Sequence, residues 1–239
     1  MANSRAFVIK SIKSGETSMI VSCYLEDIGY KSFMVKGILG TKKSKFSKAH
    51  FFPMNFINLN YSYSESKNFG FIKEVKSEKL YNSLHVDIQK SSVIIFISEI
   101  LNNIFKEDIG TNKKLFYFLK SSLSWYDDVD SCNNFHIKFL LELTKYIGFY
   151  PNIKNDKDLF FNINDGSSSI SKPNGLIIRD EEFKIFKLFL GTKFEDLNMI
   201  KVNNKFRVKI LKFIIDYYSI HLQMFKPPKS INVLSEIFK

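Results

Sequence analysis

The sequence predicts an α+β protein in which a small N-terminal β-barrel precedes a helical region. Three observations support this class. Residues 1–80 form short apolar runs separated by turn signals, as in a small barrel. After Leu80 the apolar residues recur with a period of 3.6, which is typical of helices. The charge is also uneven, because residues 1–80 hold 13 Lys and Arg against 6 Asp and Glu, most of the net charge of +11.

Five runs in the first third are predicted to be strands. They lie at residues 6–10, 19–25, 31–35, 54–63 and 69–75. Gly15 and Gly29 mark turns between the first three runs. Five short strands with a basic loop flanked by aromatic residues favour a five-stranded OB-fold barrel, a fold that binds single-stranded nucleic acid on one face. An SH3-like barrel is the alternative.

The remaining chain is predicted to be mostly helical. Helices are expected at about residues 86–106, 112–125, 133–147, 181–190, 203–222 and 230–238. Asn133 and Asn134 are good N-cap residues for the third helix. Gly148 lies where a left-handed residue ends a helix, and Pro151 prevents its continuation.

The helical pattern is interrupted once, at about residues 152–179. Within this segment Asp165 and Gly166 form a turn signal between two short runs, at residues 158–163 and 168–171, which predicts a small β-hairpin. We therefore expect two domains: an OB-fold nucleic-acid-binding domain at residues 1–80, and a helical domain at residues 81–239 that carries the hairpin as an insert.

A cluster of lysines lies between the third and fourth predicted strands. Residues 28–63 contain six Lys and no Asp or Glu. Five lie close together: Lys36, Lys42, Lys43, Lys45 and Lys48. Lysines at this spacing repel one another unless an anion faces them, and a phosphate backbone fits best because its neutralisation releases counterions. We predict that these five bind DNA and that Phe46 stacks on bases. A solvated lysine-rich surface is the alternative.

A second basic cluster lies on the predicted helix at residues 203–222. Its members are Lys205, Arg207, Lys209 and Lys212. A functional interpretation is a docking groove for an acidic peptide, and the alternative is the solvated face of a helix whose other face is apolar. The charge is not expected to bind membranes, because no lipidation motif or amphipathic basic helix accompanies it.

Residues that could carry catalysis or bind a metal are sparse. The four histidines, at positions 50, 85, 136 and 221, are not spaced as metal ligands on one helix. Cys23 and Cys132 are far apart, and we expect both to be buried free thiols of a cytosolic protein. Glu74 and Lys76 match part of a nuclease site, but alternation on one exposed strand face explains them better. We expect no enzymatic activity, no metal and no cofactor.

The order of several segments resembles the RecO family of bacterial recombination mediator and repair proteins, particularly its Bacteroidetes-type members. These segments include Val35-Lys36-Gly37 before a Lys/Ser-rich loop, Tyr146-Ile-Gly148-Phe149-Tyr-Pro151, and Tyr217-Tyr218 with His221 before Lys229-Ser230. No single motif is specific, so the resemblance depends on their order and spacing over essentially the whole chain.

The resemblance implies an OB-fold domain followed by a helical domain with a zinc-ribbon-like insert. It implies binding to single- and double-stranded DNA, annealing of complementary strands, and no nucleotide hydrolysis. The implied partners are RecR and the C-terminal tail of single-stranded DNA-binding protein, and such proteins help RecA to displace that protein. A cytoplasmic, nucleoid-associated location follows from the same resemblance.

The sequence departs from the family pattern in the insert. Many members carry four cysteines after the segment around Gly148, whereas residues 152–179 contain none. We therefore expect the hairpin to lack zinc and to be held by side-chain packing. For the tail peptide, which is acidic and ends in Phe, the helix that carries Arg207 is the candidate binding site.

Overall fold

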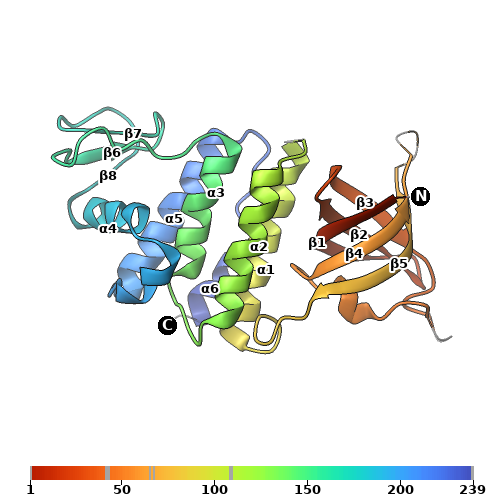
Figure 1. Ribbon diagram of the computed structural model, residues 1–239. Coiled ribbons are helices and arrows are strands. Elements are labelled where there is room, and N and C mark those ends of the chain that lie inside the picture. The colour runs from red at the N-terminus through yellow and green to blue at the C-terminus, as the bar shows by residue number, and fades with distance from the viewer. Residues whose placement is uncertain (1, 41–43, 65, 67, 108–109, 238–239) are drawn as a thin grey trace. The chain divides into compact units, whose positions relative to one another are not determined.

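The computed structural model of the chain describes residues 2–40, 44–64, 66, 68–107 and 110–237. The chain forms two compact units, Met1–Asp127 and Asp128–Lys239. The first unit contains a barrel and two long helices, and the second contains further helices and a small sheet (Figure 1). Within the described ranges, no helix is both long enough and apolar enough to cross a membrane.

Five strands form the N-terminal barrel. They are β1 (Ala2–Ser14), β2 (Ser18–Leu25), β3 (Gly29–Val35), β4 (Phe56–Ser62) and β5 (Gly70–Lys79). The barrel closes in the order β1-β2-β3-β5-β4, and all neighbours are antiparallel except β3 and β5. The predicted OB-type barrel is confirmed, and each of the five predicted runs coincides with a strand.

Alternate residues of each strand fill the barrel interior. The strand residues in this core are Ala6, Val8, Val21, Cys23, Leu25, Phe33, Val35, Ile57, Leu59, Tyr61 and Ile72. Gly70 allows the parallel strands to close, because a Cβ there would lie 2.8 Å from the Phe33 ring and from the Ser62 carbonyl oxygen. Only glycine permits this close approach of β5 to β3.

Helices cover part of the barrel's outer surface within the same unit. These are α1 (Ile88–Ile104), the short 3₁₀ helix η2 (Phe105–Glu107) and α2 (Lys113–Asp128). Phe116 lies 5.2 Å from Phe7 and 6.0 Å from Phe56, and Phe105 stacks on Tyr24 at 4.3 Å, all measured between ring centroids. We call the surface formed by Phe7, Tyr24 and Phe56 the helix-covered end of the barrel.

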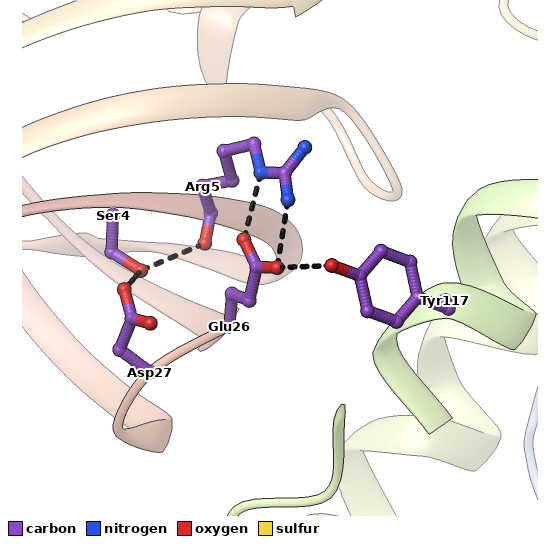
Figure 2. A network of polar contacts seen from close by, with 5 residues as sticks. All are labelled: Ser4, Arg5, Glu26, Asp27 and Tyr117. Carbon is purple, nitrogen blue, oxygen red and sulfur yellow. Dashed lines mark hydrogen bonds and ion pairs between the residues drawn. The ribbon is translucent and has the colours of Figure 1, made fainter. Parts of the chain in front are cut away.

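A polar network borders the helix-covered end (Figure 2). Arg5 Nε and Nη2 donate to the two carboxylate oxygens of Glu26, each at 2.7 Å, and Tyr117 of α2 donates to the same carboxylate at 3.0 Å. The paired Arg5 guanidinium holds the pKa of Glu26 below its ordinary value. The network therefore joins β1, the β2–β3 turn and α2 through one ionised side chain.

The connection from β5 to α1 is fixed by a buried carboxylate. Asp127 accepts hydrogen bonds from the backbone N–H groups of Asn82, Ser83 and Leu84. The ammonium group of the buried Lys90 donates to Ser83 Oγ and to the Asp127 carbonyl oxygen. Strands change to helices near residue 80 as the sequence indicates, while the compact unit extends to residue 127.

The second unit is built on α3 (Phe135–Ile147), α4 (Asp180–Gly191), η3 (Phe194–Met199), α5 (Asn204–His221) and α6 (Ile231–Ile237). Gly148 adopts a φ of 92° after α3, so the predicted left-handed end of this helix is confirmed. The prediction that Asn134 caps α3 is wrong, because its side chain makes no capping hydrogen bond. Its amide donates instead to the carbonyl oxygens of Leu197 and Ile200.

The insert forms a three-stranded sheet in the order β7-β6-β8. Strands β6 (Phe160–Asn162) and β7 (Ser167–Ser169) make the predicted hairpin, whose turn includes Gly166 at a φ of 66°. The third strand, β8 (Ile177–Arg179), was not predicted; it pairs with the other edge of β6.

Packing and hydrogen bonds hold the insert. Phe161 of β6 is fully buried against Phe186 of α4 and Tyr217 of α5. The Asp158 carboxylate accepts hydrogen bonds from the Ser168 hydroxyl and from the Asn155 backbone N–H. The described residues contain no group of three or more His, Cys, Asp or Glu side chains that could hold a metal.

Candidate nucleic-acid interface

The end of the barrel away from α1 and α2 exposes apolar side chains over β3 and β5. Met34 of β3 pairs in register with Phe71 of β5, and both point outward because their strand neighbours Phe33 and Ile72 are buried inside. A shallow pocket of about 400 Å³ lies here, lined by Met34, Lys36, Asn68, Phe69 and Phe71. We call this surface the open end of the barrel.

The open end combines an aromatic face with a cation. Phe71 is 39% exposed, and the Lys36 ammonium lies 5.6 Å from the centroid of its ring. An exposed ring presents a flat surface on which any base can stack, and an adjacent lysine can contact the phosphate that follows the base. The chemistry of this surface therefore suits single-stranded nucleic acid.

The loop after β3 carries two further predicted lysines that the structure describes. The Lys45 side chain is exposed, and its ammonium donates to the Lys73 carbonyl oxygen. Lys73 lies at a bulge in β5, where the pairing with β4 skips from Ile72 to Glu74. Because a bulge leaves one residue unpaired, its carbonyl oxygen is free to receive Lys45. Lys48 is exposed in the short helix η1 (Lys48–Phe51).

The described part of this loop is anchored to the barrel. Phe51 is buried in the core, and its carbonyl oxygen accepts a hydrogen bond from Ser11 at 2.7 Å. Phe46 packs partly buried against the same core, with its ring edge-on to Phe51 at 6.3 Å. Phe71 is thus more accessible for base stacking than the predicted Phe46. The predicted Lys42 and Lys43 lie outside the described residues.

The second predicted cluster is not assembled on one surface. Arg207 is half-buried and faces Asn134, whereas Lys209 is exposed and pairs with Glu182 of α4 at 2.6 Å. Lys205 and Lys212 are exposed on α5. The structure therefore separates Arg207 from the three lysines that the sequence grouped with it.

The histidines that the structure describes have structural surroundings. His85 and His221 each lie 2.9 Å from a backbone carbonyl oxygen, those of Pro53 and Ile163. His136 is fully buried, and burial, together with the nearby Arg207 charge, lowers the pKa of its imidazole to about 3. Such a group stays neutral near pH 7 and lacks the access to solvent that proton exchange with a ligand needs.

The cysteines and the Glu74–Lys76 pair match their predicted roles. Cys23 and Cys132 are both buried free thiols, and burial raises the pKa of each. Glu74 and Lys76 are both exposed, as alternate residues on the outer face of a strand should be.

Comparison with known proteins gives the family of the chain. One family model, for the N-terminal part of recombination protein O, matches residues 1–81, and a second, for its C-terminal part, matches residues 85–231. The chain belongs to the RecO family. The predicted resemblance is therefore confirmed over nearly the whole length.

Curated relatives extend this result. A protein of Flavobacterium psychrophilum is 38% identical over 98% of both chains, and one of Christiangramia forsetii is 34% identical over 100% of this chain and 99% of its own. A protein of Phocaeicola vulgatus is 31% identical over 97% of this chain and 96% of its own. Each of the three is named DNA repair protein RecO.

The match to the RecO family does not specify which residues form the candidate interface, so these residues come from the structure. Sequence reasoning found the lysines from their charge but missed Met34, Phe69 and Phe71. The signal for this apolar surface is that Met34 and Phe71 both point outward from neighbouring strands. It could not be used from the sequence, because the parallel pairing of β3 with β5 joins segments that are more than 30 residues apart.

Proposed function

We propose that the chain acts in DNA repair and recombination as a mediator that binds DNA and catalyses no reaction. The observation that carries this proposal is the open end of the barrel, where Lys36 lies beside the exposed ring of Phe71. A protein built to hold single strands needs such a combination of flat apolar surface and cations. Membership of the RecO family supports the same role.

The open end is proposed to bind single strands with little sequence preference. Bases stack on Phe71 and its neighbours, while Lys36, Lys45 and Lys48 contact phosphates, and Lys42 and Lys43 add to the same loop. Stacking and phosphate contacts leave the hydrogen-bonding edges of the bases free. A second strand can then pair with the bound one, which is how this surface would anneal complementary strands. Duplex DNA would be held through phosphates alone.

The protein partners belong to the same proposal. With RecR, the chain helps to load RecA onto DNA that is coated by single-stranded DNA-binding protein. The tail of that protein is acidic and ends in Phe, so it needs an apolar pocket with a cation. A pocket of about 590 Å³ in the second unit supports this, since Tyr150, Pro151, Ile153 and Leu190 line it together with Lys187. It suits the tail better than the separated residues of α5. The proposed location is the cytoplasm, in association with the nucleoid.

The alternative function is a protein–protein adaptor whose basic loop binds an acidic partner. The exposed Phe71 favours DNA over this alternative, because an acidic protein surface offers no flat bases for the ring.

Replacement of three lysines tests the proposal. The variant combines Lys36→Ala, Lys45→Ala and Lys48→Ala. We expect the slope of log affinity for a single strand against log salt concentration to become less steep by about 0.7 per lost phosphate contact, or about 2 in total. The measurement is a titration of a labelled single-stranded oligonucleotide at several salt concentrations.

The matched control removes three exposed lysines of the same unit, Lys106, Lys113 and Lys114, and so changes the net charge equally. It should leave the salt dependence within error of the original protein. Equal effects of the two triple variants would refute the loop assignment, and no oligonucleotide binding by the original protein would favour the adaptor.

A further inference from the structure

The second unit contains a polar pocket that the barrel interface does not involve. It has a volume of about 420 Å³ and lies where the start of α3, the end of η3 and the start of α5 meet. Its polar lining residues are Ser131, Asn133, Asn134, Asn198, Lys201 and Arg207. No residue that lines it is acidic, so a cationic group there has no carboxylate in the pocket itself.

Arg207 is the unusual member of this lining. Its guanidinium donates to Asn134 Oδ1 at 3.3 Å, to Asn204 Oδ1 at 3.4 Å and to the Val202 carbonyl oxygen at 3.0 Å. All three acceptors are neutral. A guanidinium has five N–H groups, so two remain for a ligand. Burial lowers the pKa of Arg207, because it disfavours the charged form of the guanidinium.

A half-buried cation without a carboxylate partner is costly unless an anion reaches it. The start of α3 favours an anion at the same place, because the positive end of its helix dipole lies there and the Asn134 side chain does not cap it. Lys201 adds a second, exposed cation at the pocket. Three independent features thus favour negative charge in one small volume.

The lining also indicates which anion fits. Hydroxyl and amide groups from Ser131, Asn133 and Asn198 accompany the two cations, and such groups suit the several oxygens of a phosphate. An acidic peptide that ends in Phe needs an apolar cavity for its ring. Only Ile200 and Val202 contribute apolar side chains here, and Ile200 is almost fully buried.

We propose that the pocket around Arg207 binds a phosphate group, supplied by the backbone of a nucleic acid. The nucleic-acid source rests on the proposed function, whereas phosphate binding itself does not. The second unit then has a contact with DNA of its own.

The first experiment tests phosphate binding on the full chain. Thermal unfolding is compared in inorganic phosphate and in chloride at equal ionic strength. We expect phosphate to raise the melting temperature of the original protein, and this rise to disappear in Lys201→Gln and in Arg207→Gln. Lys201 is exposed, so its replacement should preserve the fold even if Arg207→Gln does not. The control Lys184→Gln removes an exposed lysine from α4 and should retain the rise.

The second experiment tests the source. For Lys201→Gln we expect the slope of log single-strand affinity against log salt concentration to become less steep by about 0.7. For Lys184→Gln we expect no change in this slope. A phosphate-dependent rise without any effect on oligonucleotide affinity would overturn the nucleic-acid source in favour of a free phosphate compound. Equal stabilisation of the original protein and Lys201→Gln by phosphate would overturn the pocket.

The two proposals can fail separately. If the triple lysine variant of the barrel binds oligonucleotides normally while Lys201→Gln binds them less tightly, the pocket stands and the loop assignment falls. If the triple variant has the reduced salt dependence and Lys201→Gln does not, the barrel interface stands and the nucleic-acid source of the phosphate in the pocket is wrong.

Discussion

The two ends of the barrel's outer surface carry similar side chains but differ in what covers them. At the helix-covered end, Phe7, Tyr24 and Phe56 are almost fully buried under α1, η2 and α2. At the open end, Phe71 is 39% exposed beside Lys36. Aromatic residues on an outer strand face therefore do not by themselves indicate function. Such residues are structural where helices of the same unit bury them, and they are candidates for binding where they stay exposed beside cations.

The largest expected effect concerns the covered end. Phe116→Ala removes a fully buried ring that contacts Phe7, Tyr24 and Phe56. We expect the free energy of unfolding to fall by about 3–5 kcal/mol, because the substitution leaves a cavity. Urea unfolding measures this loss, and the fraction that remains folded should bind DNA normally.

The exposed Phe52 provides a matched control, since Phe52→Ala removes a ring that is 51% exposed and should cost far less. Equal losses for Phe116→Ala and Phe52→Ala would mean that the helices do not stabilise the barrel as described.

A smaller effect is expected at the open end, and on binding instead of stability. Phe71→Ala should weaken single-strand binding by about 1–3 kcal/mol, because one base loses its stacking partner. The salt dependence should not change, since no phosphate contact is lost. Phe71→Tyr should restore affinity, and Phe52→Ala should have no effect on it. If Phe71→Ala binds oligonucleotides as the original protein does, bases do not stack on this ring.

The smallest effect concerns the border of the covered end. Glu26→Gln replaces a carboxylate that accepts from Arg5 and Tyr117, and we expect a loss of about 1 kcal/mol at pH 7, because Arg5 is partly exposed. The folded state lowers the pKa of Glu26. Its contribution is therefore complete above the unfolded pKa, about 4.3, and disappears as the pH falls through the lower folded pKa.

Unfolding of the original protein and of Glu26→Gln at pH 7 and at lower pH measures this difference. The gap between the two proteins should close as the solution becomes acidic. Tyr117→Phe serves as a control, because it removes one hydrogen bond and leaves the ion pair. A gap that is the same at both pH values would show that the charge of Glu26 contributes nothing.

Local features of the fold could be predicted from the sequence, whereas features that depend on distant pairing could not. The strands, the end of α3 at Gly148 and the hairpin at Gly166 follow from short patterns. The pairing of Met34 with Phe71 and the strand β8 depend on segments far apart in the chain. The role of Asn134 was misjudged for the same reason, because its side chain donates to carbonyl oxygens in and just after η3 instead of capping the helix that it precedes.

The candidate sites divide in the same way. Charge density identified the lysine loop, since repulsion between neighbouring lysines is a local property. Arg207 was grouped with the lysines of its helix, but packing turns it toward the start of α3 and away from Lys205, Lys209 and Lys212. Helical spacing already places residue 207 well away from residues 205, 209 and 212 around the axis, and that signal was available.

The cover on the barrel also has a consequence for synthesis on the ribosome. Residues 1–80 emerge with all five strands, yet Phe7, Tyr24 and Phe56 lack the rings of Phe105 and Phe116 that pack on them until η2 and α2 follow. At roughly 5–20 residues per second, this interval lasts about 2–10 s. We expect a nascent chain arrested near residue 80 to bind chaperones. A chain arrested after α2 has emerged should be folded and should not bind them. The first stable product of translation is then the barrel together with its two helices.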